Sequence, residues 1–556
     1  MKLMVNRCVI SVVGCVLSVQ VIAEEPRSVG LENMAELLRG DVRLIAMGDS
    51  YSTPYFARVP LAGLRVWPIE NISALCSGAP MNSHMFICTA QCNPVALIQS
   101  SDNFGYTVER NSADSYFALP LRGIREIYTS KTFDDEGSDQ LFEFGMNSAG
   151  FDYLSNGVHG RFAELGDDVM FRFLYRCPSD RSTQVEQMKL LDYGEEVGIM
   201  HLRDGARPLW HLGEDPTAGS RLAVPEHINA AADDYPARNN IDGFLKMQLE
   251  QVESLVGTHQ YFEPAGCVYY HRDAGGNRKQ GLYFGHLADD SWSYSGFGCN
   301  TESADTHDKR FSLEQFTHWL DVTTLDRNQP TVFLWYFAPE QENYDSAKEL
   351  MTNMVDQADQ ASKLVGLQSV NHLIVISHLF DMWQYNSKEE IQFVTNQQNA
   401  AYDLAVLQSN VAVASIFEAT DHVMFNGTNA IPWLVEHGFD AFEFGTTSIN
   451  LIETSNGDLL DTANVHPKNP DASAFFSAIL GDIIREAGCP ADLLPNGEID
   501  VNDLLLVIGD WGEQGEGDIN EDGIVDIQDL LLVIGGWGEC WPVQAPFNTS
   551  TFQNLK

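Results

Sequence analysis

Residues 41–50 read Asp-Val-Arg-Leu-Ile-Ala-Met-Gly-Asp-Ser, and this stretch decides the fold. The run from Val42 to Met47 is largely apolar and partly β-branched, which predicts a buried strand. It ends at Gly48, which permits a tight turn, and Ser50 follows two residues later. A serine just past the carboxyl end of a central strand lies where open α/β sheets place their chemistry. The stretch therefore predicts an open sheet with Ser50 at its reactive edge.

Three later segments also have the character of buried strands, and long helical segments separate them. The expected strands are Thr331–Tyr336, His372–Ser377 and Val411–Phe417, and the expected intervening helices are Ser346–Val365 and Lys388–Leu407. Strands that alternate with long helices imply parallel pairing through right-handed crossovers. A helix over residues 31–38 precedes this pattern and a terminal helix over 472–486 follows it. We expect one α/β domain built from these elements.

Residues 101–290 have a different character. Short alternating runs such as Val169–Tyr175 and Gly281–Gly285 are separated by turn residues, and residues 268–276 read as a hairpin. This pattern predicts an antiparallel β-sandwich inserted into the α/β domain. Its aromatic and arginine side chains fit two interpretations, a surface that binds sugar and an ordinary core with a polar rim.

Near the C-terminus, two copies of one pattern begin at Asp492 and Asp518. In the second copy, oxygen-bearing side chains stand at loop positions 1, 3, 5, 9 and 12, and Gly523 stands at the sharp turn of position 6. Position 7 supplies a backbone carbonyl. Calcium prefers such a cage of hard oxygen ligands. The expected ligands are Asp518, Asn520, Asp522, Ile524, Asp526 and Asp529.

The first copy matches the calcium pattern less completely, because Leu494 occupies position 3. Its expected ligands are Asp492, Asn496, Asp500 and Asp503. The alternative is an acidic loop pair that holds no metal. Each loop is followed by Leu-Leu-Leu-Val-Ile-Gly-x-Trp-Gly, a short apolar helix that can bury its face only against its twin.

The tail of residues 489–541 resembles dockerin type I modules and the dockerin-like tails of secreted bacterial proteins. The resemblance implies a small all-α calcium-binding domain, with structural Ca²⁺, and a cohesin-like protein as its partner. Cys489 and Cys540 bracket the two loops, which suggests a disulfide that clasps the ends of the domain.

The Gly48-Asp49-Ser50 motif at the first strand resembles block I of the SGNH/GDSL hydrolases. This resemblance implies a flavodoxin-like, three-layer parallel sheet. It makes Ser50 the nucleophile and makes its backbone N–H one donor to the oxyanion. No cofactor is implied for catalysis.

A serine hydroxyl needs a base to remove its proton, and histidine suits this role near pH 7. The segment His466-Pro-Lys-Asn before the terminal helix resembles block V of the same family, so His466 is the expected base. The family places an aspartate three residues before this histidine, where the chain has Ala463. Asp461 is our candidate for orienting the imidazole. A Ser–His dyad oriented by a backbone carbonyl is the alternative.

The oxyanion hole departs from the family pattern. Residues 294–301 resemble block II, with Gly296 or Gly298 as the donor. In block III, Pro339 occupies the position of the family's asparagine, and Gln341 and Asn343 are the candidate replacements. Without such a donor, transition-state stabilisation weakens by roughly 3–4 kcal/mol.

A second polar group follows the strand at 372–377. Ser377 and His378, with Asp381, form a rival catalytic combination by residue type. No nucleophile elbow surrounds them, so we expect His378 and Asp381 to line the cleft instead.

The N-terminus predicts export. Residues 1–23 combine a positive start, an apolar run from Cys8 to Val19 and a small-residue cleavage site, which is typical of a secretory signal. An N-terminal membrane anchor is the alternative, although the run is shorter than the ~20 residues that a span needs. The mature chain should carry no membrane span and be secreted, to an extracellular or periplasmic location. Its eight remaining cysteines fit disulfides better than a metal site at Cys88 and Cys92.

Composition excludes several function classes for this 556-residue chain. With 44% hydrophobic and 10% aromatic residues, it can bury large cores, which excludes general disorder. Its 78 Asp and Glu against 33 Lys and Arg give a net charge of −45. Sequence-independent binding to nucleic acid needs the opposite charge, and so does binding to an anionic membrane.

The sequence predicts a secreted serine esterase of SGNH/GDSL type that deacylates a carbohydrate. A non-catalytic extracellular protein that binds carbohydrate or protein is one alternative, and a lipase-like or thioesterase activity is another. The expected domains are a signal (1–23), a discontinuous hydrolase domain (24–100 and 291–487), the β-rich insertion (101–290), the calcium-binding repeats (489–541) and a tail (542–556).

Overall fold

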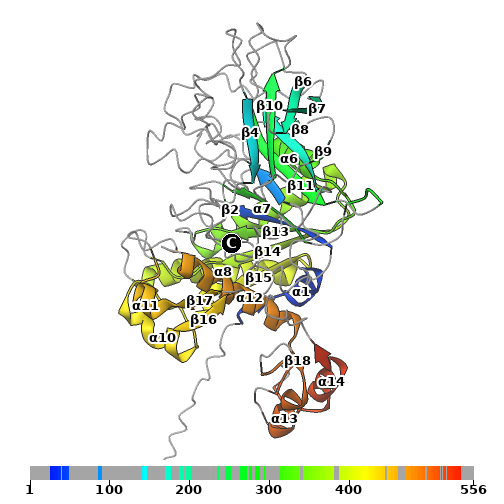
Figure 1. The fold of residues 1–556 in the computed structure, drawn as a ribbon. Coiled ribbons are helices and arrows are strands. Elements are labelled where there is room, and N and C mark those ends of the chain that lie inside the picture. Colours follow the sequence, from blue (N-terminus) through cyan, green and yellow to red (C-terminus); the bar gives the residue numbers. More distant parts are fainter. Residues whose placement is uncertain are drawn as a thin grey trace, which may run out of the picture.

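The computed structural model describes about half of the chain, including most of the expected α/β domain and of the C-terminal repeats. The described residues are 26–38, 41–48, 86–89, 141–146, 169–176, 187–192, 195–201, 229–230, 234–236, 245–251, 263–271, 275–278, 282–288, 294, 313–338, 342–380, 387–444, 447–460, 467, 470–494, 498–513, 515, 517–520 and 523–539. Figure 1 shows these parts as a coloured ribbon.

Five parallel strands form the centre of the main sheet. Their spatial order is β15 (Val411–Ser415), β14 (Val370–Ile376), β13 (Thr331–Tyr336), β2 (Val42–Gly48) and β12 (Leu282–Ala288). Every residue of β2 and β13 is buried, which explains why both strands are largely apolar. The prediction of a mixed α/β fold with a parallel core is confirmed, and the strand bounds agree with expectation within a few residues.

Helices cover both faces of this parallel core. On one face, α1 (Glu32–Leu38) and α12 (Pro470–Gly488) pack with Leu44, Val332 and Leu373 in one hydrophobic cluster. The neighbouring residues of each strand point to the opposite face, which α6 (Leu313–Thr323) and α7 (Tyr344–Val365) cover. The contacts Phe333–Phe316 and His372–Asp359 show this. On this second face, α8 (Ser387–Leu407) packs beside α7. The core is therefore three-layered, as the alternating pattern indicates.

One strand of the expected insertion belongs to the α/β sheet. Strand β12 falls within residues 101–290, yet it pairs in parallel with β2 along its whole length, from Leu282 opposite Val42 to Ala288 opposite Gly48. It is therefore a central strand of the α/β sheet. The segment Leu-Tyr-Phe-Gly-His-Leu-Ala is short and contains a glycine and a histidine, so its local pattern does not distinguish the two settings.

Beyond β12, the main sheet continues with one more parallel strand and then with antiparallel strands. Strand β3 (Phe86–Thr89) pairs in parallel with β12, and then β11 (Glu263–His271) and β5 (Val169–Arg176) follow in antiparallel order. Short strands β8 (Asn229–Ala230) and β9 (Tyr235–Pro236) pair with β5. The β3–β11 register sets Cys88 opposite Cys267. Of these strands, β11, β5, β8 and β9 fall within the expected insertion, and they extend the main sheet.

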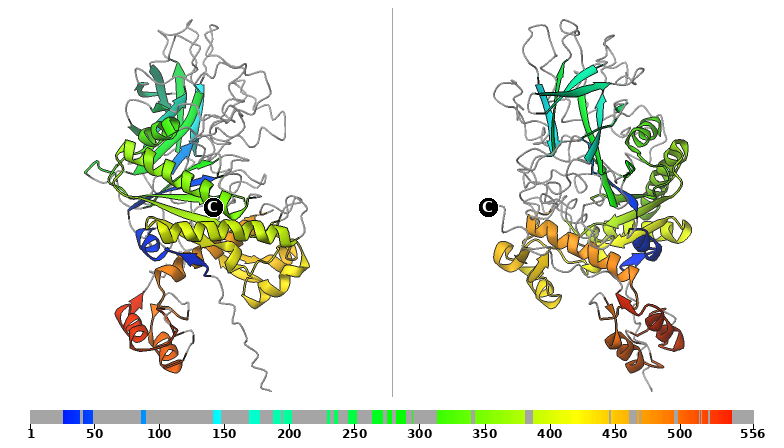
Figure 2. Two further views of the ribbon diagram at one scale, coloured as in Figure 1. Left: turned by 180° about the vertical axis from the view of Figure 1, so that it is seen from behind. Right: turned by 45° about the vertical axis from the view of Figure 1, so that its right-hand side comes forward.

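A second antiparallel sheet contains four strands. Its order is β4 (Leu141–Met146), β10 (Leu245–Gln251), β6 (Gln187–Asp192) and β7 (Glu195–His201). Figures 1 and 2 show this sheet at one end of the molecule and the C-terminal repeats at the opposite end, with the α/β core between them.

The C-terminal repeats form a small lobe beyond α12 (Figure 2). Helices α13 (Val501–Gly509) and α14 (Ile527–Gly535) pack together, and strands β18 (Glu498–Ile499) and β19 (Gly538–Glu539) pair beside them. Val507, Val525 and Val533 are fully buried at the centre. The two helices confirm the pair of apolar segments expected after the loops.

The remaining described elements are short. They are β1 (Ser28–Val29), α9 (Ile416–Ala419), a 3₁₀ turn at Thr428–Ala430, α10 (Ile431–Glu436), β16 (Ala441–Phe444), β17 (Thr447–Asn450) and α11 (Leu451–Ser455). Among the described helices, none combines the length and the apolar character that crossing a membrane requires.

Candidate active site at the carboxyl edge of the sheet

The order of the parallel strands creates one topological switch point. In chain order the five central strands are β2, β12, β13, β14 and β15, so the chain first places β12 on one side of β2 and then the later strands on the other. Open α/β sheets bind ligands outside the carboxyl ends of the strands at such a reversal, which here lies between β2 and β13. Gly48 pairs with Tyr336 and with Ala288, so these carboxyl ends are level.

Gly48 is the last residue of β2 at this switch point. Its φ is 154°, a conformation that glycine adopts far more readily than other residues. Asp49 and Ser50 follow directly in the sequence but lie outside the described residues. The described part of β2 therefore places Ser50 two residues beyond a strand end at the switch point.

The residues on either side of the expected base and its partner are paired. Leu460 and Pro467 form an isolated β-bridge, and residues 461–466 lie between them in the sequence. Leu460 is buried in the cluster that contains Phe475 and Phe476 of α12. Asp461 and His466 themselves lie outside the described residues. Their roles stay predictions.

The oxyanion candidates are described only in part. Tyr294 is buried, and its ring lies 4.6 Å from that of Phe337, which brings the start of the expected block II beside the end of β13. Gly296, Gly298 and Gln341 lie outside the described residues. Asn343 is the N-cap of α7, where its Oδ1 accepts the Ser346 backbone N–H at 3.0 Å. The Nδ2 group of the Asn343 side chain is the part that could donate a hydrogen bond to an oxyanion.

His378 follows β14 and is fully buried. Its ring stacks on Phe476 of α12, with the ring centroids 4.1 Å apart. The imidazole therefore lies between the carboxyl edge of the sheet and the helix that follows the block V loop. Asp381, its expected companion in the cleft, lies outside the described residues.

A buried polar network ties β13 and β14 to α7, and sequence patterns did not reveal it. The Trp335 indole N–H donates to His372 Nδ1 at 3.0 Å, and His372 Nε2 lies 3.0 Å from Asp359 Oδ1. Because the indole can only donate, His372 must carry its proton on Nε2. The only sequence sign was the polar His372 in an apolar strand.

In the C-terminal lobe, the second loop folds around two carboxylates. Asp518 Oδ2 accepts the Gly523 N–H at 2.8 Å, and Asp529 Oδ1 accepts the N–H groups of Ile519 and Asn520. Asp526 is the N-cap of α14, in a capping box with Asp529. Burial would raise the pKa of Asp529, but hydrogen bonds from these backbone N–H groups lower it below the ordinary value. The carboxylate is therefore charged at neutral pH.

The first loop repeats this arrangement. Asp503 is buried, its Oδ1 accepts the Leu494 N–H, and its Oδ2 accepts the N–H of Asp500, the N-cap of α13. The oxygen-only donor chemistry of both loops fits a hard cation such as calcium. Asn496 and Asp522 lie outside the described residues. Among the residues that are described, no three His, Cys, Asp or Glu side chains are grouped closely enough to hold a metal ion.

Cys489 directly follows α12, at the start of the lobe. It is almost fully buried and disulfide-bonded. Cys540 directly follows β19 but lies outside the described residues, so the pairing of these two cysteines stays a prediction.

Comparison with known proteins gives distant likenesses only. No family model and no curated protein matches the chain. A solved peptidoglycan O-acetylesterase matches over 82% of this chain and 96% of its own, with 8% identity and a TM-score of 0.39. The protein YXIM of Bacillus subtilis matches over 58% of this chain and 78% of its own, with 10% identity and a TM-score of 0.23. A GDSL-like lipase of Bacteroides ovatus matches over 61% of this chain and 88% of its own, with 10% identity and a TM-score of 0.17. Likenesses at this level add no argument about function.

Proposed function

We propose that this protein is a secreted serine esterase of SGNH/GDSL type that removes acyl groups from a carbohydrate. The observation that carries the proposal is the switch point between β2 and β13. A Gly-Asp-Ser motif follows β2 at that point, and the φ of Gly48 suits an abrupt exit from the strand. The strand order comes from the structure and the motif comes from the sequence, and both indicate the same edge of the sheet.

In the proposed reaction, Ser50 attacks the ester carbonyl and His466 accepts the serine proton. Asp461 orients the imidazole, or a backbone carbonyl does so in its place. The β-bridge between Leu460 and Pro467 supports the first choice, because it pairs the residue before Asp461 with the residue after His466. The Ser50 N–H, Gly296 or Gly298, and an amide from Gln341 or Asn343 would hold the oxyanion.

A fluorophosphonate probe tests the nucleophile. The purified protein should be labelled covalently, and Ser50→Ala should lose the label because the attacking hydroxyl is gone. Ser52→Ala is the matched control and should keep it. His466→Ala should slow labelling by roughly 10²–10⁴-fold, the usual contribution of a general base. Absence of labelling in the parent protein would refute the esterase.

A non-catalytic binding protein is the second candidate. Two sequence departures favour it, Ala463 in the position of the family's aspartate and Pro339 in the position of its asparagine. This candidate predicts binding of glycans or a protein partner without probe labelling. Hydrolysis of acetylated polysaccharides, compared with that of long-chain acyl esters and acyl thioesters, separates the proposed specificity from a lipase-like or thioesterase activity.

The C-terminal lobe is proposed to bind calcium and a cohesin-like partner. Exposed apolar side chains recur at equivalent positions of its two repeats: Val501 and Ile527, Leu505 and Leu531, Ile508 and Ile534, Trp511 and Trp537. Each of these side chains is about half exposed. Large apolar side chains exposed on a small lobe often mark a protein interface. The proposal also includes secretion through the signal at residues 1–23 and a β-sandwich that the insertion contributes.

A further inference from the structure

His378 is a buried ionisable residue that the proposed reaction does not use. It is the second residue after β14, the strand that pairs with β13 on one side of the switch point. Its side chain has no exposed surface. A side chain enclosed in this way does not reach a substrate that enters from solvent, so any contribution of His378 to the reaction has to act through another residue.

The imidazole packs into a cluster of aromatic rings at the start of α12. It stacks on Phe476, in the second turn of the helix, with the ring centroids 4.1 Å apart and the ring planes at 18°. Phe425 and Phe475 meet Phe476 edge-on and also meet each other edge-on. None of these three phenylalanines has exposed surface. Because faces and edges of aromatic rings pack in specific geometries, the ring of His378 holds the start of α12 against the end of β14.

The same cluster continues to the block V loop, which contains the expected base. The Phe425 carbonyl accepts the Leu459 backbone N–H at 2.8 Å, and Leu459 is fully buried. The next residue, Leu460, is bridged to Pro467, which directly follows His466 in the sequence. Buried contacts therefore lead from the end of β14 to the residues on both sides of this loop.

A shift of α12 would reach the expected base through these contacts. Protein interiors are close-packed, so a cavity beside one ring lets its neighbours move. A general base has to stand within hydrogen-bonding reach of the hydroxyl that it deprotonates. Misplacement by about 1 Å can slow a reaction about 100-fold. Loss of the stack should therefore slow the chemical step.

We propose that His378 is a positioning residue for the esterase reaction. By stacking on Phe476 it fixes the start of α12, and with it the block V loop and its base. This inference rests on the proposed function. It assigns the effect to the flat face of the imidazole, which a phenylalanine can replace and a leucine cannot.

Hydrolysis of 4-nitrophenyl acetate by the full chain tests the proposal, with active molecules counted by fluorophosphonate labelling. His378→Leu and Phe476→Leu each remove the stack from one side. Each should lower kcat per labelled molecule by about 10–100-fold with little change in KM. His378→Phe should restore most of the rate. The double variant should lose no more than either single variant, because both changes remove the same contact.

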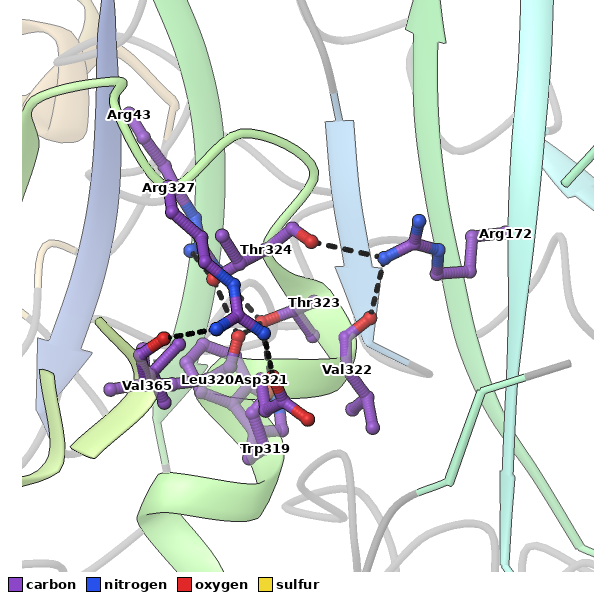
Figure 3. A network of polar contacts seen from close by, with 10 residues as sticks. All are labelled: Arg43, Arg172, Trp319, Leu320, Asp321, Val322, Thr323, Thr324, Arg327 and Val365. Carbon is purple, nitrogen blue, oxygen red and sulfur yellow. Dashed lines mark hydrogen bonds and ion pairs between the residues drawn. The ribbon is translucent and has the colours of Figure 1, made fainter. Parts of the chain in front are cut away.

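A matched control lies at the opposite, amino edge of the sheet. Figure 3 shows Thr323 at the end of α6, where its Oγ1 accepts a hydrogen bond at 2.7 Å from Nη2 of Arg43, near the start of β2. Both side chains are buried. Thr323→Val keeps the shape of the side chain but removes the acceptor. It should lower the thermal midpoint and leave kcat per labelled molecule unchanged.

Three results would overturn the proposal: an unchanged kcat per labelled molecule in the leucine variants, a loss that His378→Phe does not restore, or an equal loss in Thr323→Val. If one leucine variant fails to fold, the other removes the same stack, and His378→Phe tests it without opening a cavity. Failure of the proposed function itself looks different, because the parent protein would then neither be labelled nor hydrolyse the ester.

Discussion

His372 illustrates how one polar residue organises three elements. It lies on β14, accepts the Trp335 indole N–H from β13, and donates to Asp359 on α7. Asn410, just before β15, donates to the same carboxylate at 3.2 Å. Burial would raise the pKa of Asp359, but the hydrogen bonds from His372 and Asn410 lower it. In its ionised form, the Asp359 carboxylate therefore links α7 to the sheet through these hydrogen bonds.

Replacing this carboxylate should destabilise the α/β domain. Asp359→Ala leaves the buried His372 N–H without an acceptor, which we expect to cost about 1–2 kcal/mol in urea unfolding at pH 7. Asp356→Ala is the matched control, because Asp356 is exposed on the same helix. It should change stability by less than about 0.5 kcal/mol. Equal losses in both variants would contradict a specific role for the network.

The same pair predicts a pH dependence. Because the folded-state pKa of Asp359 is lowered, its contribution to stability is complete above the ordinary aspartate pKa of about 3.9 and is lost as the pH falls through the lower value. The stability difference between the parent and Asp359→Ala should therefore shrink below about pH 4. A difference that stays constant from pH 6 to pH 3 would contradict this.

At the scale of elements, a close approach of two loops supports the segment that leads to the block V loop. Gly457 has a φ of 74°, and an added Cβ would lie 2.9 Å from the Gly427 carbonyl oxygen and 3.0 Å from Ile431 Cγ1. Gly457→Ala should destabilise by about 2–4 kcal/mol through backbone strain and overpacking together. Gly438→Ala, with a φ of 73° and open space around it, isolates the strain and should cost only about 1 kcal/mol. Both unfolding free energies are measured by chemical denaturation. If Gly457→Ala and Gly438→Ala lose the same amount, packing around Gly457 contributes nothing.

The sequence predicted where the helices and strands lie along the chain better than it predicted which strands pair with each other. Strand β13 occupies Thr331–Tyr336 as expected, because a continuous apolar run has one plausible setting inside an α/β fold. The place of β12 was missed, because pairing partners depend on contacts across hundreds of residues that local periodicity does not encode. For the candidate site, the motif and the strand end at Gly48 were predictable. The caps and stacking partners of Asn343 and His378 were not, since they depend on tertiary packing.

At the scale of the whole molecule, the negative charge is not evenly distributed. Thirteen acidic residues and no Lys or Arg lie between Cys489 and Cys540. This lobe buries few apolar side chains, and its helices leave Leu505, Leu531 and both tryptophans exposed. Mutual repulsion of so many carboxylates opposes folding of such a small core. A bound cation that neutralises the loop charges would stabilise it, as in other small metal-dependent domains.

Calcium removal should therefore loosen the lobe and leave the α/β domain intact. With a chelator, we expect faster proteolysis within residues 489–541 and no change in the unfolding of the rest. In calcium titrations followed by tryptophan fluorescence, Asp518→Ala should weaken binding by about tenfold or more, equivalent to ~1.4 kcal/mol for each factor of ten. Asp492→Ala should have a smaller effect, because Leu494 already leaves the first loop one ligand short. Glu513→Ala removes one exposed charge from the same lobe outside the ligand positions. If it weakens binding as much as Asp518→Ala, the lobe attracts calcium by its overall charge and the assigned ligand set is wrong.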